Sequence, residues 1–350
     1  MKVIVDAMGG DNAPQSNVQG ALNAIKEYGV DVVLTGDGKI LLECLKSLGV
    51  ENLPKGLEIV HADEIITMED DPATAFRRKK DSSLTVGLEL LNEGAGDAFV
   101  SAGSTGALLS AATLLTKRVK GIRRAALAPV VPTGNGGAVL IDCGANAECT
   151  PEYLLQFAYM GSFYAQRVLG RKEPKVGLLN IGAEPTKGTK LQKETYLLLE
   201  EAGRSGEIHF AGNVEAREAV EGAVDVIVAD GYSGNIFLKT VEGAGLFLGR
   251  QMKGMFKKNL ITKLAAVLVK DGIREFKALL DADRVGGTAL IGISKPVIKA
   301  HGSSNAVAIQ NAIRQGFTLA QSGLIDDITA QVGHMTPEKG KMCGEKVEKS

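Results

Sequence analysis

Residues 3–11 have the sequence VIVDAMGGD, in which an apolar run ends in two glycines and an aspartate. A short run of β-branched residues that ends in small residues is typical of a strand in a parallel sheet, where helices cover both faces. Further runs of this kind recur along the chain, at Val32–Thr35, Leu57–Val60, Ala98–Ser101, Val139–Cys143, Val176–Asn180, Ile208–Ala211, Val224–Ala229, Thr288–Ile291 and Pro296–Ile298. Each run is predicted to form a strand.

Longer stretches with helical spacing of apolar residues separate these runs, at Ser16–Tyr28, Lys39–Leu48, Ala107–Thr116, Pro151–Leu169, Thr189–Glu201, Val214–Glu221 and Asn305–Gln321. Apolar strands that alternate with helices predict an α/β fold, with a mostly parallel sheet layered by helices.

Four of the predicted strands lead into polar loops that contain glycine, at Met8–Asp11, Ser101–Gly106, Asp142–Asn146 and Asp230–Asn235. In open α/β sheets, ligands bind at the carboxyl ends of the strands. We therefore expect these loops to gather around one ligand site.

The composition excludes several classes of protein. Lys and Arg total 40 and Asp and Glu total 41, so a net charge of −1 argues against a nucleic-acid-binding surface. No stretch approaches 18 apolar residues, no apolar signal segment follows Met1, and the four cysteines lack CxxC spacing. The sequence predicts a soluble cytoplasmic protein with reduced thiols.

Residues 1–335 are predicted to form a single compact α/β domain, followed by a polar tail at 336–350. A helical hairpin at about 236–280 interrupts the strand–helix rhythm and is expected to protrude. Its tip carries lysines and an apolar stripe, formed by Lys257, Lys258, Leu260, Ile261, Leu264 and Leu268. Core packing, a dimer interface or a tip resting on an anionic membrane all suit such a stripe.

Familiar cofactor motifs are absent from the expected places. The residues after the first strand lack the GxGxxG pattern, and Gly182–Thr189 differs from a P-loop because Lys187 precedes the glycine. The four histidines have no zinc-binding spacing. The sequence therefore indicates neither a metal nor a cofactor.

Several residues could hold an anion or a proton. The Ser101–Gly106 loop, placed between a strand and a helix, suits an anion cradle or an ordinary capped turn. Lys187 suits a phosphate contact or a solvated loop. His301 follows the last predicted strand, where a lone histidine is more often structural.

Two basic runs complete the candidate features. Arg77, Arg78, Lys79 and Lys80 form one run, and the other extends from Lys117 to Arg124. Such runs usually form solvated faces, although here they could also dock an acidic partner protein.

Blocks along most of the chain resemble the bacterial phosphate acyltransferases of phospholipid synthesis, the PlsX family. The matching blocks are Val5–Pro14, Met68–Leu84, Val100–Leu108, Asp142–Asn146, Asp230–Asn235 and Gly286–Gly302. Ser104 stands where the family pattern has Asn, which keeps a polar side chain in that loop.

The resemblance implies an enzyme that converts a long-chain acyl-acyl-carrier protein and inorganic phosphate into acyl phosphate and the free carrier. A membrane glycerol-3-phosphate acyltransferase would then use the acyl phosphate. The resemblance also implies a fold like those of isocitrate and isopropylmalate dehydrogenases and of phosphotransacetylases. A homodimer that associates peripherally with the inner face of the cell membrane is expected as well.

With this reaction in view, we assign candidate roles to individual residues. Phosphate and acyl binding is assigned to Gly9, Gly10, Asp11, Ser101, Gly103, Ser104, Thr105, Gly106, Asn146 and Gly234. Catalytic roles are assigned to Lys187, Asp230, Asn235, Lys295 and His301, and carrier docking to the run that begins at Arg77. The alternatives are a phosphotransacetylase-like enzyme that uses acyl-coenzyme A and a non-catalytic scaffold at the membrane surface.

Overall fold

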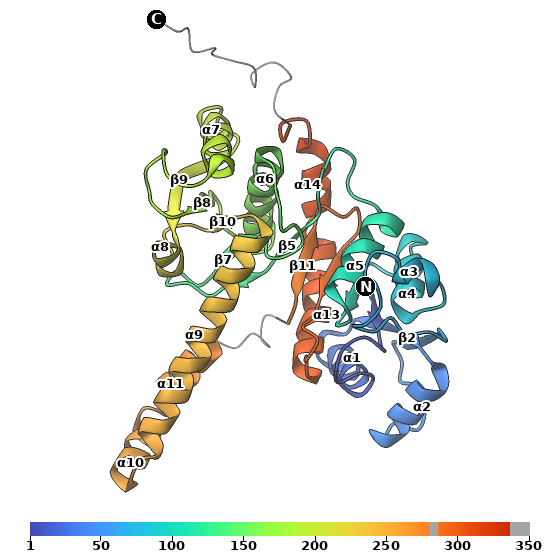
Figure 1. Ribbon diagram of the computed structural model, residues 1–350. Coiled ribbons are helices and arrows are strands. Elements are labelled where there is room, and N and C mark those ends of the chain that lie inside the picture. Colours follow the sequence, from blue (N-terminus) through green and yellow to red (C-terminus); the bar gives the residue numbers. More distant parts are fainter. Residues whose placement is uncertain (280–285, 337–350) are drawn as a thin grey trace, which may run out of the picture.

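The computed structural model of the chain describes residues 1–279 and 286–336, which form two β-sheets with helices on both faces (Figure 1). The first sheet contains β1 (Lys2–Asp6), β2 (Asp31–Gly36), β3 (Leu57–His61), β4 (Ala98–Ser101), β5 (Ala126–Ala128), β11 (Thr288–Ile291) and β12 (Val297–Lys299). The second contains β6 (Val130–Val131), β7 (Ala138–Ile141), β8 (Lys175–Asn180), β9 (His209–Glu215) and β10 (Val226–Val228). The predicted α/β class with mostly parallel strands is confirmed, but the strands form two sheets.

The helices before the second sheet are α1 (Gln15–Tyr28), α2 (Gly38–Ser47), α3 (Ala75–Arg78), α4 (Ser83–Asn92) and α5 (Thr105–Ala111), which continues into the π-helical turn η1 (Ala112–Thr116). The later helices are α6 (Pro151–Arg167), α7 (Lys190–Arg204), α8 (Ala216–Glu221), α9 (Gly231–Lys257), α10 (Leu260–Leu268), α11 (Lys270–Leu279), α13 (Ala306–Gln321) and α14 (Leu324–Gln331).

The first sheet has the strand order β3-β2-β1-β4-β12-β11-β5, and only β11 runs antiparallel to its neighbours. Successive side chains of a strand point to opposite faces. Val3 and Val5 accordingly pack in the core beneath α1 and α13, while Ile4 packs in a second core beneath α4. The carboxyl ends of β1, β4 and β12 therefore lie side by side at one edge of the sheet.

The second sheet has the order β6-β7-β10-β8-β9, in which β6 alone is antiparallel to its neighbour. Helix α6 covers one face with buried residues such as Leu154 and Phe157. On the other face, Leu140 and Ile227 pack with Phe237 of α9. The ends of β7 and β10 meet at the edge from which α9 starts.

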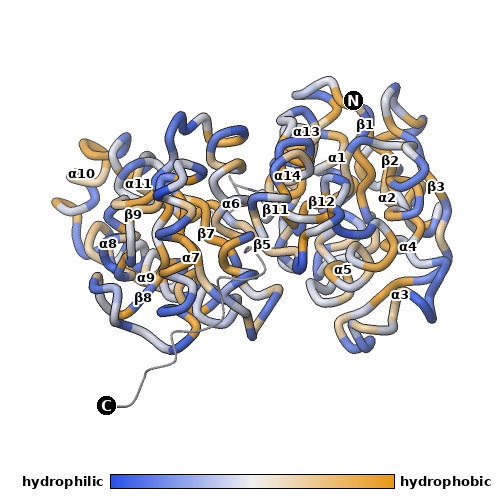
Figure 2. The backbone as a smooth tube through the Cα atoms, turned by 90° about the horizontal axis from the view of Figure 1, so that it is seen from above, coloured by the Kyte–Doolittle hydropathy of each residue, from blue (hydrophilic) through white to orange (hydrophobic). Residues whose placement is uncertain are grey.

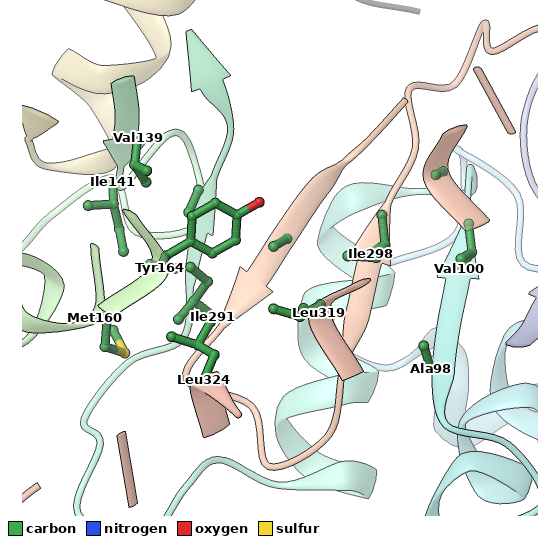
Figure 3. Close-up of a cluster of buried hydrophobic side chains, with 14 of the residues drawn as sticks. Ala98, Val100, Val139, Ile141, Met160, Tyr164, Ile291, Ile298, Leu319 and Leu324 are labelled. Carbon is green, nitrogen blue, oxygen red and sulfur yellow. The ribbon is translucent and has the colours of Figure 1, made fainter. Parts of the chain in front are cut away.

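The two sheets share a hydrophobic core. Figure 2 shows the molecule from above as two halves that meet near α6 and β11. At this junction Tyr164 and Met160 of α6 lie beside Ile291 of β11 and Leu324 of α14 (Figure 3). This continuous core supports the prediction that residues 1–335 form a single domain, which stays a prediction.

Helices α9, α10 and α11 form the predicted arm, which projects from the body (Figure 1). Asn259 caps α10, which has no buried residue and carries hydrophobic colours at the edge of Figure 2. Leu260 is 82% exposed and Leu268 80% exposed. Within the described part of the chain, no helix combines the length and the apolar character needed to cross a membrane.

The sequence missed several elements. Strands β5 and β6 are short, and Pro129 between them ends one sheet and begins the other. Helix α4 is apolar on most sides because the first sheet and η1 enclose it, so it lacks a clear polar face. The predicted tail from residue 337 onward and the end of the arm at residue 280 lie outside the described residues.

Candidate active site

Asp6 is the last residue of β1, and its buried carboxylate joins three segments of the site. Its Oδ1 accepts hydrogen bonds from Ser83 Oγ at 2.6 Å and from the backbone N–H groups of Met8 and Gly9. Its Oδ2 accepts a hydrogen bond from Ser101 Oγ at 2.6 Å. The carboxylate therefore fixes the loop after β1 against the end of β4 and the start of α4.

The loop after β1 needs glycine because backbone of the neighbouring loops lies against it. A Cβ atom on Gly9 would stand 2.8 Å from the Gly103 backbone nitrogen, and one on Gly10 would stand 3.1 Å from the Gly302 carbonyl oxygen. The backbone N–H of Asp11 donates to the Gly302 carbonyl oxygen at 2.8 Å. The loops after β1, β4 and β12 are thus packed together, as the sequence predicted for such loops.

In the Ser101–Gly106 loop, the two serine hydroxyls form hydrogen bonds within the fold, and Gly106 is closely packed. Ser101 Oγ, besides donating to the β1 carboxylate, accepts a hydrogen bond from the Gly103 N–H at 3.1 Å. Ser104 caps α5, and a Cβ atom on Gly106 would stand 2.8 Å from a neighbouring proline side chain. Thr105 is exposed and borders a cavity. Its side chain is the one in this loop most open to a ligand.

Lys299 ends β12, beside Ser101 in the neighbouring strand. Its side chain is only 8% exposed, and its Nζ donates to the carbonyl oxygens of Ala102, at 3.3 Å, and Ala300. Burial lowers the pKa of Lys299 to about 8, although the carboxylates of Asp6 and Asp11 favour the charged form. The loop cluster therefore holds a lysine that changes charge near neutral pH.

A cavity of about 490 Å³ lies between the two sheets and reaches Lys299. Its polar lining residues are Thr105, Asn235, Lys239, Glu242, Lys299 and His301. Its apolar lining residues are Met68, Leu127, Pro129, Val130, Val131, Pro132, Leu238 and Val241. The cavity can therefore accept a ligand that has both a charged part and an apolar part.

In the second sheet, Asp142 has the position that Asp6 has in the first. It follows β7 and is fully buried, and it accepts hydrogen bonds from the backbone N–H groups of Leu127, Cys143 and Asn146 at 2.6–2.9 Å. Burial raises the pKa of Asp142, while these donors oppose the rise. Asn146 also donates its side-chain amide to Asp142 and to the Ala125 carbonyl oxygen, so its predicted substrate-binding group is engaged within the fold.

The Asp230–Asn235 loop begins α9. Asp230 caps the helix by accepting hydrogen bonds from the Ser233 N–H and Oγ, at 2.8 and 2.9 Å. A Cβ atom on Gly234 would stand 2.0 Å from the Asp142 carbonyl oxygen, so the first turn of α9 sits tightly on the loop after β7. Asn235 is exposed and borders the cavity.

The predicted catalytic residues are only partly brought together. His301 borders the cavity, and its Nδ1 lies 2.9 Å from Ser303 Oγ. Lys187 is exposed in the loop after β8 and is not among the residues that line the cavity. Lys295 is exposed before β12, at the opposite end of that strand from Lys299.

Cys143 also borders the cavity, but its chemistry does not suit a nucleophile. Burial and the Asp142 carboxylate raise the pKa of the Cys143 thiol to about 12. The thiolate is the reactive form of cysteine. The thiol is therefore unreactive near neutral pH, so it does not suit the formation of a covalent intermediate.

The predicted carrier-docking residues follow shortly after Met68, which lines the cavity. Lys79 is half-buried, and it donates to Asp70 Oδ2 at 2.6 Å and to the Ile65 carbonyl oxygen at 2.8 Å. It therefore holds the segment that contains Met68. Arg77, Arg78 and Lys80 are exposed, which leaves them as the docking candidates.

Sequence reasoning missed Asp6 and Lys299, although a signal was present for both. Asp6 is a carboxylate within an otherwise apolar strand, and such a group needs hydrogen-bond partners when buried. Lys299 follows the last predicted strand at its carboxyl end, where ligands bind, whereas Lys295 precedes it.

Comparisons with known proteins agree with this architecture. The family model described as "Fatty acid synthesis protein" matches residues 1–327. A protein from Clostridioides difficile named "Phosphate acyltransferase" is 45% identical over 339 residues, which span 97% of this chain and 98% of that protein. A protein of the same name from Alkaliphilus oremlandii is 46% identical over 336 residues, which span 96% of this chain and 98% of that protein.

Two solved structures have the same fold. A phosphotransacetylase from Streptococcus pyogenes gives a TM-score of 0.63 at 18% identity, with 92% of this chain and 94% of that chain covered. A 4-hydroxythreonine-4-phosphate dehydrogenase from Burkholderia phymatum gives a TM-score of 0.51 at 15% identity, with 91% and 98% covered. These likenesses confirm the predicted fold, and the matches to curated relatives show more: the chain belongs to the phosphate acyltransferase family and is an enzyme of that type, not a non-catalytic scaffold.

Proposed function

We propose that the protein transfers a long-chain acyl group from acyl-carrier protein to inorganic phosphate, which yields acyl phosphate and the free carrier. The observation that carries this proposal is the cavity between the sheets, which is lined both by the cationic Lys299 and by apolar side chains. Phosphate is a small dianion and the acyl chain is apolar, so the lining suits both reactants.

The reaction needs no reactant beyond these two. An oxygen of hydrogen phosphate attacks the thioester carbonyl carbon, and the new carbon–oxygen bond places negative charge on the carbonyl oxygen. The carbon–sulfur bond then breaks, and its electron pair leaves with sulfur. The proton of hydrogen phosphate ends on the sulfur, so the products are acyl phosphate and the free thiol. Holding the reactants at attack distance supplies much of the rate enhancement.

Residues of the cavity suit the remaining steps. Thr105 at the start of α5 offers a hydroxyl to phosphate, and Asn235 offers an amide to the carbonyl oxygen as charge develops there. His301 can carry the proton between phosphate and sulfur. Lys187 stays a candidate phosphate ligand, and a steep rise in the phosphate requirement of Lys187→Ala is the result that would place it in the site.

Arg77, Arg78 and Lys80 are proposed to receive the acidic carrier protein, because they are exposed and α3 packs against α5 beside the cavity. Reversing the charge of all three should raise the KM for the acyl carrier and leave the KM for acyl-coenzyme A unchanged. Equal KM values for the carrier in wild type and variant would exclude this face.

The exposed apolar residues of the arm support two further proposals, a homodimer formed along α9 and contact of α10 with an anionic membrane. Membrane contact would deliver acyl phosphate to a membrane glycerol-3-phosphate acyltransferase. The double variant Leu260→Glu, Leu264→Glu should sediment less with anionic vesicles than the wild type, and equal sedimentation would refute the membrane contact.

The function is tested by thiol release from palmitoyl-acyl-carrier protein with and without phosphate, with hydroxylamine to trap acyl phosphate. Release that requires phosphate, together with trapped hydroxamate, is the expected result. Turnover of acyl-coenzyme A but not of the acyl carrier would instead assign a phosphotransacetylase-like activity. Inactivity with both donors would refute the proposed function.

A further inference from the structure

We propose that Lys299 is the residue that binds the nucleophilic phosphate, with its ammonium group directed into the cavity between the two sheets. The proposal rests on the proposed function and adds a phosphate-binding residue to it. From the sequence, Lys187 was the lysine expected to contact phosphate and Lys295 had a catalytic role, whereas Lys299 was passed over.

The ammonium group of Lys299 is placed to contact a ligand in the cavity. Lys299 lines the cavity with Thr105 and Gly302, yet only 8% of the residue is exposed. A lysine ammonium has three N–H donors, and the carbonyl oxygens of Ala102 and Ala300 accept two of them. The third donor is left for a ligand in the cavity, and the two carbonyl contacts hold the ammonium in place before the ligand arrives.

Burial of the Lys299 ammonium carries a free-energy cost. Burial disfavours a cation unless an anion compensates for it. Asp6 and Asp11 lie close enough to favour the ammonium form, yet neither is within ion-pair distance of Lys299 among the described contacts. Asp6 is instead engaged with Ser101 and Ser83. A phosphate dianion beside Lys299 would supply the missing partner.

The other lysines considered for the site are either paired with a carboxylate or do not line the cavity. Lys239 of α9 also lines the cavity, but its Nζ pairs with Glu242 Oε2 at 2.7 Å. Lys187 and Lys295 are exposed and do not line the cavity. Among the residues described as lining the cavity, Lys299 is therefore the lysine whose charge is not already neutralised by a carboxylate at contact distance.

Binding of inorganic phosphate alone, measured by calorimetry without an acyl donor, tests the proposal. Lys299→Met keeps the side-chain length and removes the charge, and it should weaken phosphate binding at least about tenfold, since a hydrogen bond to a charged group is lost. Lys299→Arg should retain part of the affinity. Lys46→Met, which alters an exposed lysine at the end of α2, is the matched control and should bind phosphate like the wild type.

The pH dependence gives a second readout on the wild type itself. Besides Lys299, the titratable groups that face it are Asp6, Asp11 and His301, with Glu242 and Lys239 across the cavity. Phosphate affinity should fall as pH rises above about 8, where Lys299 loses its proton and inorganic phosphate no longer changes its charge. An affinity that stays constant through this range would overturn the proposal even if Lys299→Met failed to fold.

Kinetics then separate the proposal from the function on which it rests. Phosphate-dependent acyl phosphate formation with an unchanged KM for phosphate in Lys299→Met would overturn the assignment and leave the function standing. A raised KM for the acyl carrier alone would assign Lys299 to the phosphate of the carrier's prosthetic group, and would also overturn it. Phosphate binding that depends on Lys299 in an enzyme that forms no acyl phosphate would refute the function and support the site.

Discussion

The two sheets each place a buried carboxylate at the end of a strand, and the surroundings of the two carboxylates differ. Asp6 in the first sheet and Asp142 in the second both collect backbone N–H groups from their loops. Among the described residues, the donors to Asp142 are all neutral and include the backbone N–H and the side-chain amide of Asn146. Asp6 has in addition a buried lysine, Lys299, in the strand beyond its neighbour.

This difference suggests a division of labour between the halves. The first half provides the charge, with Lys299, Thr105 and His301 at the ends of its strands. In the second half, the loop after β7 packs tightly against the first turn of α9, and α9 contributes Asn235, Leu238 and Val241 to the cavity lining. The glycine-containing loops after β1 and β7 thus differ in role, because of these two loops only the one after β1 lies beside the buried ammonium group of Lys299.

The largest effect is expected from removing the carboxylate of the second half. Asp142→Ala removes the acceptor of four backbone N–H groups, those of Leu127, Cys143, Ala145 and Asn146, so the free energy of unfolding should fall by about 3–5 kcal/mol. Urea denaturation measures the loss. Asp37→Ala, which removes the exposed cap of α2, is the comparison and should cost about 1 kcal/mol. Equal losses in the two variants would contradict a structural role for Asp142.

The charged form of Lys299, in the first half, should lower the free energy of unfolding, whereas the Asp142 carboxylate raises it. The pKa of Lys299 is lowered from 10.5 to about 8, so the folded state binds this proton less tightly than the unfolded state. Below pH 8 the full cost of burying the charge is present, and this cost disappears as pH rises toward 10.5. The stability of the wild type relative to Lys299→Met should therefore increase by about 3 kcal/mol over this range.

Urea denaturation of both proteins without phosphate, at neutral and alkaline pH, checks this prediction. Other groups titrate in both proteins and cancel in the difference. A stability difference that does not change with pH would mean that Lys299 is not buried as a cation, and the contrast between the halves would fail.

The smallest effect is expected at the start of α9. Asp230→Ala removes the cap that holds the first turn and should cost about 1 kcal/mol of stability, with a lower kcat because Asn235 is displaced. Asp230→Ser keeps a capping oxygen and should restore most of both. Wild-type turnover in Asp230→Ala would remove this residue and its loop from the catalytic account.

Much of the fold was accessible from the sequence. The bounds predicted for β4 and β11 are the observed ones, because strands that are buried on both faces are apolar runs bounded by turns. The split into two sheets was not accessible, since it depends on the chain after Pro129 pairing with β7 and not continuing along β11, which pairs with β5. The sequence shows that Lys299 follows the end of a predicted strand. It does not show that the side chain is buried, because burial depends on which loops cover it, so Lys299 was missed.

Oxygen-18 in labelled inorganic phosphate identifies the nucleophile most directly. The wild type is incubated with palmitoyl-acyl-carrier protein and oxygen-18 phosphate, and the mass of the intact acyl phosphate is measured by mass spectrometry. We expect acyl phosphate that retains all the labelled phosphate oxygens and that forms in equal amount to the released thiol. Thiol release accompanied by free fatty acid without the label would show that water is the nucleophile, and would contradict the account.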